Sequence, residues 1–368
     1  MPDNEVWRPS TICVIGTGLM GGSFGLACKR ADPAIEVIGF DIDRRSLEKA
    51  VARGAIDRAG VDLASTVHDA DLILIAVPSS MVAEVFHKIR SDVPPGAIVT
   101  DVGSTKSSII DAIAESGSEV AFIGGHPIAG SEHEGIDAAS EDLFDGADWI
   151  LTPTDATDAV AYGRLVRLLG SLGVQVLALD PRKHDEAMAV ASHLPQVVAS
   201  ALMGFASDLA SGGGTPLIAG GGFKDMTRIA ASPTEMWVDI LKENKFAVAT
   251  AISGFGERLN ELKGLVEEAD WDKLRTVLDE ARLARRALGA KPGIDVDEMI
   301  EIKIPVPDKP GALAEVTTSL GEAGVNIEDL NITHSPEGGR GTISIWVAGE
   351  DNARAATHTL VDRGYQPE

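Results

Sequence analysis

Short apolar runs alternate with amphipathic segments over the first half of the chain. Seven such runs lie between Ser10 and Asp180, and most are continuously apolar, as expected for strands that are covered on both faces. The segments between them, such as SLEKAVARG and SSMVAEVFHKIRSDV, have helical periodicity. Repeated strand–helix units predict an α/β fold over residues 1–182, with a Rossmann-type, doubly wound, mostly parallel sheet. The apolar runs are TICVIG, EVIGFD, DLILIAVP, GAIVTDVG, VAFIGG, DWILTP and VQVLALD.

The strand pattern stops after Asp180 and helical periodicity replaces it. Pro181 suits a first helical turn, whereas Pro195 predicts a kink or a break farther along the helix. The sequence SPTE at 232–235 has the N-cap, first-turn proline and capping-box glutamate of another helix start. Residues 183–290 are therefore predicted to form an all-helical domain. Its apolar residues lie on too many faces for a spacer, which indicates a dimer interface.

A third pattern follows the Gly- and Pro-containing linker ALGAKPGIDVDEM. Residues 297–368 predict a strand (MIEIKIPVP), a helix (GALAEVTTSLGEAG), two strands (VNIEDLNITH and GTISIWVAG), a helix (EDNARAATHTLVDRG) and a short tail. This order approximates βαββαβ, so we expect a small ferredoxin-like domain.

Composition restricts the possible partners. The chain has 368 residues and a net charge of −24, which disfavours nucleic acid and anionic membranes. No apolar run approaches the roughly 18 residues of a bilayer span, and the polar start MPDNEVWRPS is unlike a signal peptide. Cys13 and Cys28 give no disulfide framework. We therefore expect a soluble, cytoplasmic protein that binds anions through local cations, helix N-termini and backbone N–H groups.

The motif GTGLMG at residues 16–21 follows the first apolar run and opens a helix. Gly16 permits a tight turn, Gly18 lets the backbone approach a pyrophosphate, and Gly21 lets the helix pack on the strand. The phosphates are expected at the helix N-terminus, where N–H groups and the helix dipole attract them. The sequence therefore predicts a dinucleotide site.

The residue at the end of the second apolar run, Asp41, indicates the preferred cofactor. Asp41 lies about 20 residues beyond the glycine motif, where the partner of a ribose 2′-OH belongs. Its carboxylate would repel a 2′-phosphate, so NAD is expected, although Arg44 and Arg45 leave NADP open. The predicted cofactor-binding residues are Gly16, Gly18, Leu19, Met20, Gly21, Asp41, Val77 and Pro78.

In a doubly wound sheet the ligand lies beyond the carboxyl ends of the strands. Val77-Pro78 follows the third apolar run, Ser104 the fourth and His126 the fifth. His126 lies in GGHPIAGSE, where the glycines leave room for a ligand beside the imidazole. His126 and the nearby EHE sequence at 132–134 lack the i,i+4 spacing of helical metal ligands, so no metal site is predicted.

Two further polar groups are candidates for substrate contacts. Ser192, His193 and Gln196 share one arc of an otherwise apolar helix, which favours a pocket wall, with His184 about two turns earlier. The segment GFKDMTR supplies the cations Lys224 and Arg228, and an arginine can bind a carboxylate through two hydrogen bonds. A surface ion pair is the alternative for Arg228.

Taken together, these segments resemble the prephenate dehydrogenase family, which includes the arogenate dehydrogenases of tyrosine biosynthesis. The resemblance covers about residues 12–260. The C-terminal unit is similar to an ACT domain at residues 307–313 and 324–327, and such domains commonly bind an amino acid effector. The matching motifs, in the family's order, are VIGTGLMGGS, DVGSTK, GGHPIAGSEHEG, SHLPQVVASAL and GGGFKDMTRIAASPTEMW.

The resemblance implies oxidative decarboxylation of prephenate to 4-hydroxyphenylpyruvate, CO₂ and NADH, without a metal. His126 matches the histidine that takes the proton of the 4-hydroxyl. Ser104 matches the serine that orients this hydroxyl, and Arg228 the arginine that holds a substrate carboxylate. Ser131 and His193 match pocket residues. The predicted substrate-binding residues are Arg228, Ser131, Ser192, His193, Gln196 and Lys224.

Three alternatives remain at this stage. Gln196 stands where some family members have a histidine, which leaves arogenate dehydrogenase open. A β-hydroxyacid dehydrogenase would need a lysine followed four residues later by an asparagine, whereas Asn244 lies between Lys242 and Lys245. The third alternative is a non-catalytic, amino-acid-sensing regulator.

The ACT-like unit suggests an effector site. Asp308 can accept from an ammonium group, and the N–H groups of Gly311 and Ala312 can bind a carboxylate at a helix N-terminus. Asn326 can bond to either end of the effector. Because tyrosine is the end product of the implied pathway, we expect tyrosine as the effector of a homodimeric enzyme.

Overall fold

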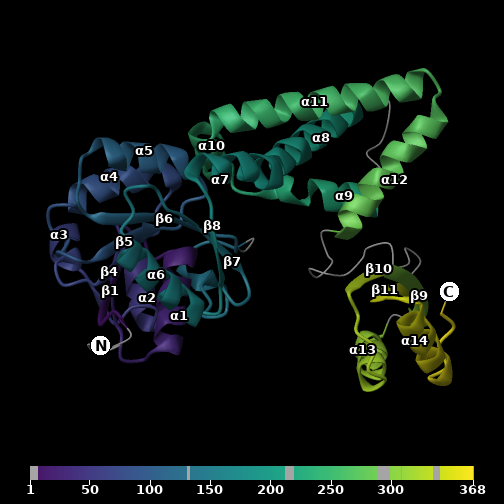
Figure 1. Cartoon of the computed structure of the whole chain (residues 1–368), viewed down its shortest axis with the longest axis horizontal. Helices are drawn as coiled ribbons and strands as arrows, with labels where there is room; N and C mark the ends of the chain where they lie inside the picture. The colour runs from purple at the N-terminus through teal and green to yellow at the C-terminus, as the bar shows by residue number, and fades with distance from the viewer. Residues whose placement is uncertain are drawn as a thin grey trace. The chain divides into compact units, whose positions relative to one another are not determined.

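The structure is a computed structural model that describes residues 7–130, 133–211, 219–287, 299–307, 309–334 and 340–367. The chain divides into two compact units, residues 1–256 and 257–368 (Figure 1). The first unit holds the α/β sheet and most of the helical region, and the second holds the C-terminal sheet.

An eight-stranded sheet in the order β3-β2-β1-β4-β5-β6-β7-β8 organises the first unit. All seven predicted apolar runs form strands, and their neighbours pair in parallel except β6 and β7, which are antiparallel. The additional strand, β3, consists of two exposed residues at the edge of the sheet, and no apolar run predicts it. The strands are β1 Thr11–Ile15, β2 Glu36–Phe40, β3 Arg58–Ala59, β4 Leu72–Ile75, β5 Ile98–Asp101, β6 Ala121–Pro127, β7 Asp148–Thr152 and β8 Gln175–Ala178.

Helices cover both faces of this sheet, which explains the continuously apolar strands (Figure 1). In β1, Ile12 and Val14 join a core cluster with α1, α2 and α6, while Cys13 and Ile15 join the opposite cluster with α3, α4 and α5. The helices are α1 Leu19–Ala31, α2 Arg44–Ala52, α3 Leu63–Val67, α4 Ser79–Ile89, α5 Ser107–Glu115 and α6 Ala159–Ser171, with the 3₁₀ turn η1 Ile136–Ala138.

Both cysteines lie inside these apolar layers. Cys13 and Cys28 are buried free thiols, as predicted from the lack of a disulfide framework. Burial raises the pKa of Cys13 to about 12 and raises that of Cys28 as well, so both thiols stay protonated and unreactive at neutral pH.

Helices follow β8 without another strand as far as residue 287, within the part of the chain that the structure describes. Pro195 does not break its helix. A π-helical segment directly before it, η2 Ala189–His193, widens the backbone where the proline cannot donate a hydrogen bond. The elements are α7 Pro181–Met188, η2, α8 Leu194–Ser211, α9 Gly221–Thr227, η3 Arg228–Ala231, α10 Thr234–Glu243, α11 Lys245–Glu267 and α12 Trp271–Ala287.

One helix contradicts the expectation that no apolar run approaches the length of a bilayer span. The continuous helix at 181–211 has an 18-residue stretch with a mean hydropathy of 1.3, so by length and composition alone it could cross a bilayer. This is weak evidence for a span, since core helices of soluble proteins can be equally long and apolar.

The second unit contains a three-stranded antiparallel sheet in the order β10-β11-β9, with two helices packed on it. The expected βαββαβ order is therefore βαββα here, because the tail up to residue 367 forms no strand. Strand β9 consequently lies at an edge of the described sheet. The elements are β9 Met299–Pro307, α13 Ala312–Glu322, β10 Asp329–His334, β11 Arg340–Ala348 and α14 Glu350–Asp362.

Candidate active site

The turn between β1 and α1 has the geometry of a dinucleotide-binding loop. Gly16 has a φ of 94°, and a Cβ there would lie 2.2 Å from the carbonyl oxygen of Ala76. A Cβ at Gly21 would lie 1.9 Å from the oxygen of Gly16, so only glycine lets α1 approach this closely. A Cβ at Gly18 would meet no atom within 4 Å. No side chain caps the N-terminus of α1, so its first N–H groups suit a phosphate.

Asp41 connects the end of β2 to this turn. Its Oδ2 accepts from the N–H of Thr17 at 2.7 Å and from the Thr17 hydroxyl at 3.1 Å. Its Oδ1 accepts from the N–H of Asp43 at 2.8 Å and has a further lone pair for a ribose hydroxyl. Arg44 and Arg45 begin α2 with exposed side chains. The residues present therefore fit a dinucleotide.

Two serines connect the neighbouring strand ends. Ser104 follows β5, and its N–H donates to the hydroxyl of Ser79, the first residue of α4, at 2.9 Å. Val77 lies next to the glycine turn, with its Cγ1 3.3 Å from where a Gly16 Cβ would lie. Pro78 is the exposed N-cap of α4. The loops after β4 and β5 are thereby held at the edge of the sheet that carries the glycine turn.

Lys106 and Asp101 form a fully buried ion pair at the carboxyl end of β5. Lys106 Nζ also donates to the carbonyl oxygen of Gly125 at 2.9 Å. Asp101 accepts from the N–H of Gly125 at 2.9 Å and from that of Gly103 at 2.8 Å. Burial lowers the pKa of Lys106, whereas the Asp101 carboxylate acts to raise it. The pair holds the ends of β5 and β6 together.

A chain of three hydrogen-bonded side chains begins at His126, near the end of β6. Its Nδ1 lies 2.8 Å from Nε2 of His184, and Nδ1 of His184 lies 2.8 Å from Oδ1 of Asp185. Asp185 also accepts from the backbone N–H of Lys106 at 2.8 Å and of Ser107 at 2.9 Å. Because His184 and Asp185 belong to α7, the helical region contributes directly to this site.

These hydrogen bonds determine which ring nitrogens carry protons. An ionised Asp185 can only accept, so His184 carries its proton on Nδ1 and accepts from His126 through Nε2. His126 therefore carries its proton on Nδ1, and its Nε2 is left as an acceptor. Burial lowers the pKa of His126 well below 6.5, and positive charge on His184 or Lys106 would act in the same direction.

Asp185 remains ionised in this buried network. Burial acts to raise its pKa, but the hydrogen bonds from His184 and from the residues that begin α5 lower the pKa overall. The site thus combines a neutral imidazole with a fixed negative charge behind it, an arrangement suited to a general base.

A second histidine lies in the same helical region. Burial lowers the pKa of His193 to about 4, and its Nδ1 lies 3.2 Å from Nδ2 of Asn244. Asn244 Nδ2 also donates to the backbone oxygen of Asp185 at 2.8 Å. The rings of His193 and Trp237 meet edge to face, with centroids 6.2 Å apart. Gln196 is buried, and its Oε1 has no hydrogen-bond partner among the described residues, which suits a ligand-facing position.

The other described substrate candidates lie on the helical elements that follow β8. Ser192 is half-buried in the π-helical segment, Lys224 lies exposed on α9, and Arg228 begins η3 with an exposed side chain. Ser131 and the effector candidate Asp308 lie outside the described residues.

The effector candidates lie in the second unit. Gly311 caps α13 with a φ of 92°, and Ala312 is the first residue of that helix. The strand expected at VNIEDLNITH, which includes Asn326, begins only at Asp329, and Asn326 Nδ2 donates to Glu328. The predicted start of the strand is therefore wrong: residues 325–328, with this amide–carboxylate pair, form the loop before the strand.

Sequence reasoning missed four polar residues of the site: Asp101, Lys106, Asp185 and Asn244. The only local signal was DVGSTK, in which an aspartate ends a buried strand and a lysine follows five residues later. A charge at such a position needs a partner, so this pair could have been inferred.

Known protein families match most of the chain between residues 24 and 358. Residues 24–178 match the nucleotide-binding domain of prephenate dehydrogenase, and residues 180–280 match the dimerization domain of the same enzyme. Residues 300–358 match the ACT domain.

Individual relatives agree with these matches. The prephenate dehydrogenase of Bacillus subtilis (strain 168) is 32% identical over 358 residues, which is 96% of each chain. A crystal structure of Aquifex aeolicus prephenate dehydrogenase with hydroxyphenyl propionate and NAD⁺ has a TM-score of 0.71 and 34% identity, and covers 77% of this chain and 100% of that one. Synechocystis arogenate dehydrogenase has a TM-score of 0.66 and 32% identity, and covers 75% of this chain and 98% of that one.

Proposed function

This chain belongs to the prephenate dehydrogenase family, and from that premise we propose that it oxidises prephenate with NAD⁺ to 4-hydroxyphenylpyruvate, CO₂ and NADH. The chain is an NAD-dependent oxidoreductase. The observation that carries the proposed mechanism is the hydrogen-bonded chain from Asp185 through His184 to His126. It leaves one imidazole nitrogen free to accept a proton at the sheet edge that carries the dinucleotide turn.

His126 Nε2 accepts the proton of the substrate's 4-hydroxyl, and Ser104 orients that hydroxyl. NAD⁺, held by the glycine turn and Asp41, supplies the hydride acceptor when bound. As His126 takes up the proton it becomes positively charged, and its Nδ1–H still donates to His184. The buried carboxylate of Asp185 stabilises this charge without moving, since its hydrogen bonds are already in place.

The substrate's anionic groups require cations in a protein of net charge −24. We assign Arg228 to a substrate carboxylate, with Lys224 as a nearby positive charge on α9. We assign the buried polar wall of the pocket to His193 and Gln196, with the half-buried Ser192 beside them. Arg228 is bound to substrate before, during and after hydride transfer, so its main effect is on affinity.

The same family membership supports a homodimer built by the helical region. Phe205 and Leu209 on α8 and Phe246 on α11 are 64%, 55% and 79% exposed in the single chain. Exposed apolar groups of this size are typical of an interface with a second copy. Sedimentation at micromolar concentration should therefore give dimers; fully active monomers would refute the assignment.

We further propose that the C-terminal unit binds tyrosine and that the reaction belongs to cytoplasmic tyrosine biosynthesis. The N–H groups at the start of α13 suit the effector carboxylate, and Asn326 suits its ammonium or carboxylate group. Removal of the residues from about Lys291 onward should leave activity and abolish the response to tyrosine. Unchanged inhibition of the truncated enzyme would place the regulatory site in the catalytic pocket instead.

The experiment that tests the proposed reaction is NADH formation with prephenate and arogenate side by side. We expect kcat/KM to be higher for prephenate, with equimolar NADH and 4-hydroxyphenylpyruvate. A preference for arogenate would make tyrosine the direct product and refute the substrate assignment. Absence of turnover with both substrates would refute the proposed activity.

A further inference from the structure

Asn244 is a buried amide at the junction of two helices in the helical region. It ends α10 and directly precedes α11, and it is 5% exposed. Its backbone N–H donates to the carbonyl oxygen of Ile240 at 3.0 Å, and its own carbonyl oxygen accepts from the N–H of Val248 at 3.0 Å. A buried amide destabilises the fold unless its polar atoms are hydrogen-bonded. The backbone is thus held on both sides, and the side chain is directed at fixed partners.

The chemistry of these partners determines the direction of both hydrogen bonds. Asn244 Nδ2 lies 2.8 Å from the backbone oxygen of Asp185, which can only accept, so this atom of the amide is the nitrogen and it donates. The same nitrogen lies 3.2 Å from Nδ1 of His193. An amide nitrogen cannot accept, so His193 Nδ1 is the acceptor. Burial lowers the pKa of His193 to about 4, so at pH 7 the ring is neutral and carries its single proton on Nε2.

The two histidines of the site therefore have opposite tautomers. His126 carries its proton on Nδ1 and has a lone pair at Nε2, whereas His193 has a lone pair at Nδ1 and a donor at Nε2. Asp185 contributes to both, because its carboxylate acts on the first ring through His184 and its backbone oxygen acts on the second through Asn244. Within the described residues, the ring of His193 forms hydrogen bonds only through Nδ1, so its Nε2–H is left for a ligand.

We propose that Asn244 is a positioning residue that makes His193 a hydrogen-bond donor toward the substrate. His193 belongs to the pocket wall under the proposed function, on which this role of Asn244 rests. The Nε2–H suits an acceptor oxygen, such as a carboxylate or keto oxygen of the substrate's side chain. The edge-to-face contact with Trp237 restricts rotation of the ring. Without the amide, the ring would be free to place its proton on Nδ1 and lose the donor, so Asn244 acts on substrate affinity through His193.

Ring ¹⁵N chemical shifts test the tautomer in the full-length protein without substrate, because protonated and unprotonated ring nitrogens have widely separated shifts. The chain has eight histidines, and His193 is identified by the signals that His193→Phe removes. At pH 7 we expect His193 of the wild type to carry a proton on Nε2 and none on Nδ1. Asn244→Asp should place a proton on Nδ1, because a carboxylate can only accept. A proton on Nδ1 in the wild type, or none there in Asn244→Asp, would overturn the proposal.

A double-variant cycle tests whether Asn244 acts through His193. Leucine has a shape similar to that of asparagine and no hydrogen-bonding group. We expect Asn244→Leu to raise KM for prephenate about two- to tenfold, the effect of one hydrogen bond, and to change kcat by less than about twofold. In the His193→Phe background, the same substitution should not raise KM further. Additive effects of the two substitutions would show that Asn244 only supports the fold, and would overturn the proposal. Asn244→Ala serves in the cycle if Asn244→Leu does not fold.

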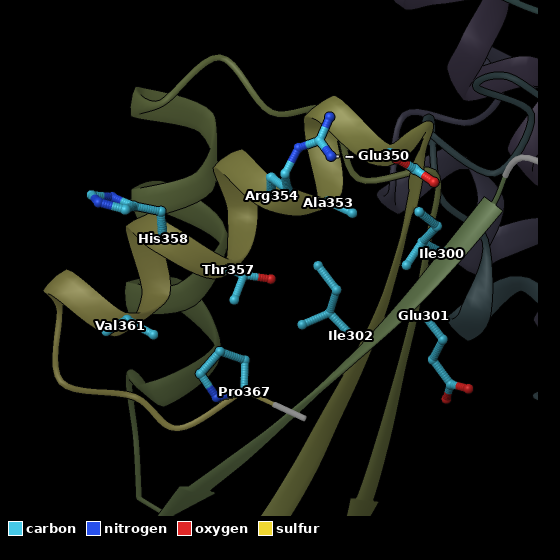
Figure 2. A pocket seen from close by; sticks show the side chains of 10 residues that line it. All are labelled: Ile300, Glu301, Ile302, Glu350, Ala353, Arg354, Thr357, His358, Val361 and Pro367. Atoms are coloured by element: carbon cyan, nitrogen blue, oxygen red, sulfur yellow. Dashed lines mark hydrogen bonds and ion pairs between the residues drawn. The ribbon is translucent and has the colours of Figure 1, made fainter.

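Asn352→Leu is the matched control. Asn352 Nδ2 also donates to a backbone oxygen, that of Ala348 at 2.7 Å, but it lies on α14 in the second unit, next in sequence to Ala353 (Figure 2). This variant should leave KM, kcat and the ring signals of His193 unchanged. The Kd for NAD⁺ should stay unchanged in every folded variant, since the glycine turn is untouched. Absence of prephenate turnover in the wild type would refute the proposed function, whereas the ¹⁵N shifts would still decide the tautomer.

Discussion

Replacement of Lys106 by methionine should destabilise the first unit by about 3–5 kcal/mol, the usual cost of removing one partner from a buried ion pair. Both side chains of the Lys106–Asp101 pair are fully inaccessible, so the remaining carboxylate cannot be hydrated. Methionine has a similar length and leaves little cavity. The loss therefore comes from the unpaired charge and from the hydrogen bond to the carbonyl of Gly125.

The assay is chemical denaturation followed by tryptophan fluorescence, since Trp149 is buried in the same core. A double variant, Lys106→Met with Asp101→Asn, should be no less stable than Lys106→Met alone, because it removes the orphaned charge as well. Lys183→Met is the matched control. It breaks the exposed ion pair with Glu186 and should change stability by less than about 1 kcal/mol.

Two results would refute this reasoning. A change of less than about 0.5 kcal/mol for Lys106→Met would show that the pair contributes nothing net to folding. A loss in the double variant equal to the sum of the single losses would show that the two charges are not coupled.

Three further predictions concern the cofactor, pH and substrate affinity. Asp41→Ser should raise the ratio of kcat/KM for NADP⁺ to that for NAD⁺, because the charge that repels a 2′-phosphate is removed; an unchanged ratio would contradict the assignment. Because His193 is neutral in the folded state, with a pKa of about 4, unfolding takes up a proton below about pH 6.5. The free energy of unfolding should thus be about 2 kcal/mol lower at pH 5 than at pH 7 from this residue, and His193→Gln should remove that difference in denaturation curves. Arg228→Ala should raise KM for prephenate much more than it lowers kcat in steady-state kinetics, and the reverse would place this residue in the chemical step.

The sheet could be predicted from the sequence because strands that are buried on both faces are continuously apolar. Residues such as Ile12 and Cys13 are adjacent yet enter opposite core clusters, so both must be apolar. The antiparallel direction of β7 could not be predicted, since the apolar pattern of a strand is the same in either direction. The two-residue β3 is exposed and carries no apolar pattern at all.

The site could be predicted only where one segment carries the chemistry. The glycine turn and the histidine at the end of β6 are local features of the sequence. The chain from His126 to His184 joins residues 58 positions apart, and only the packing of α7 at the sheet edge brings them together. Likewise, the hydrogen bonds from the start of α5 that keep Asp185 ionised depend on tertiary structure.

The central claim is that His126 is the general base of an NAD-dependent prephenate oxidation. The most direct measurement compares NADH formation from prephenate by the wild type and by His126→Asn, together with the NAD⁺ affinity of both proteins. We predict that kcat falls by roughly 10²–10⁴ in the variant while the Kd for NAD⁺ changes little. Near-normal turnover by His126→Asn, or loss of NAD⁺ binding as the cause of its inactivity, would contradict the account.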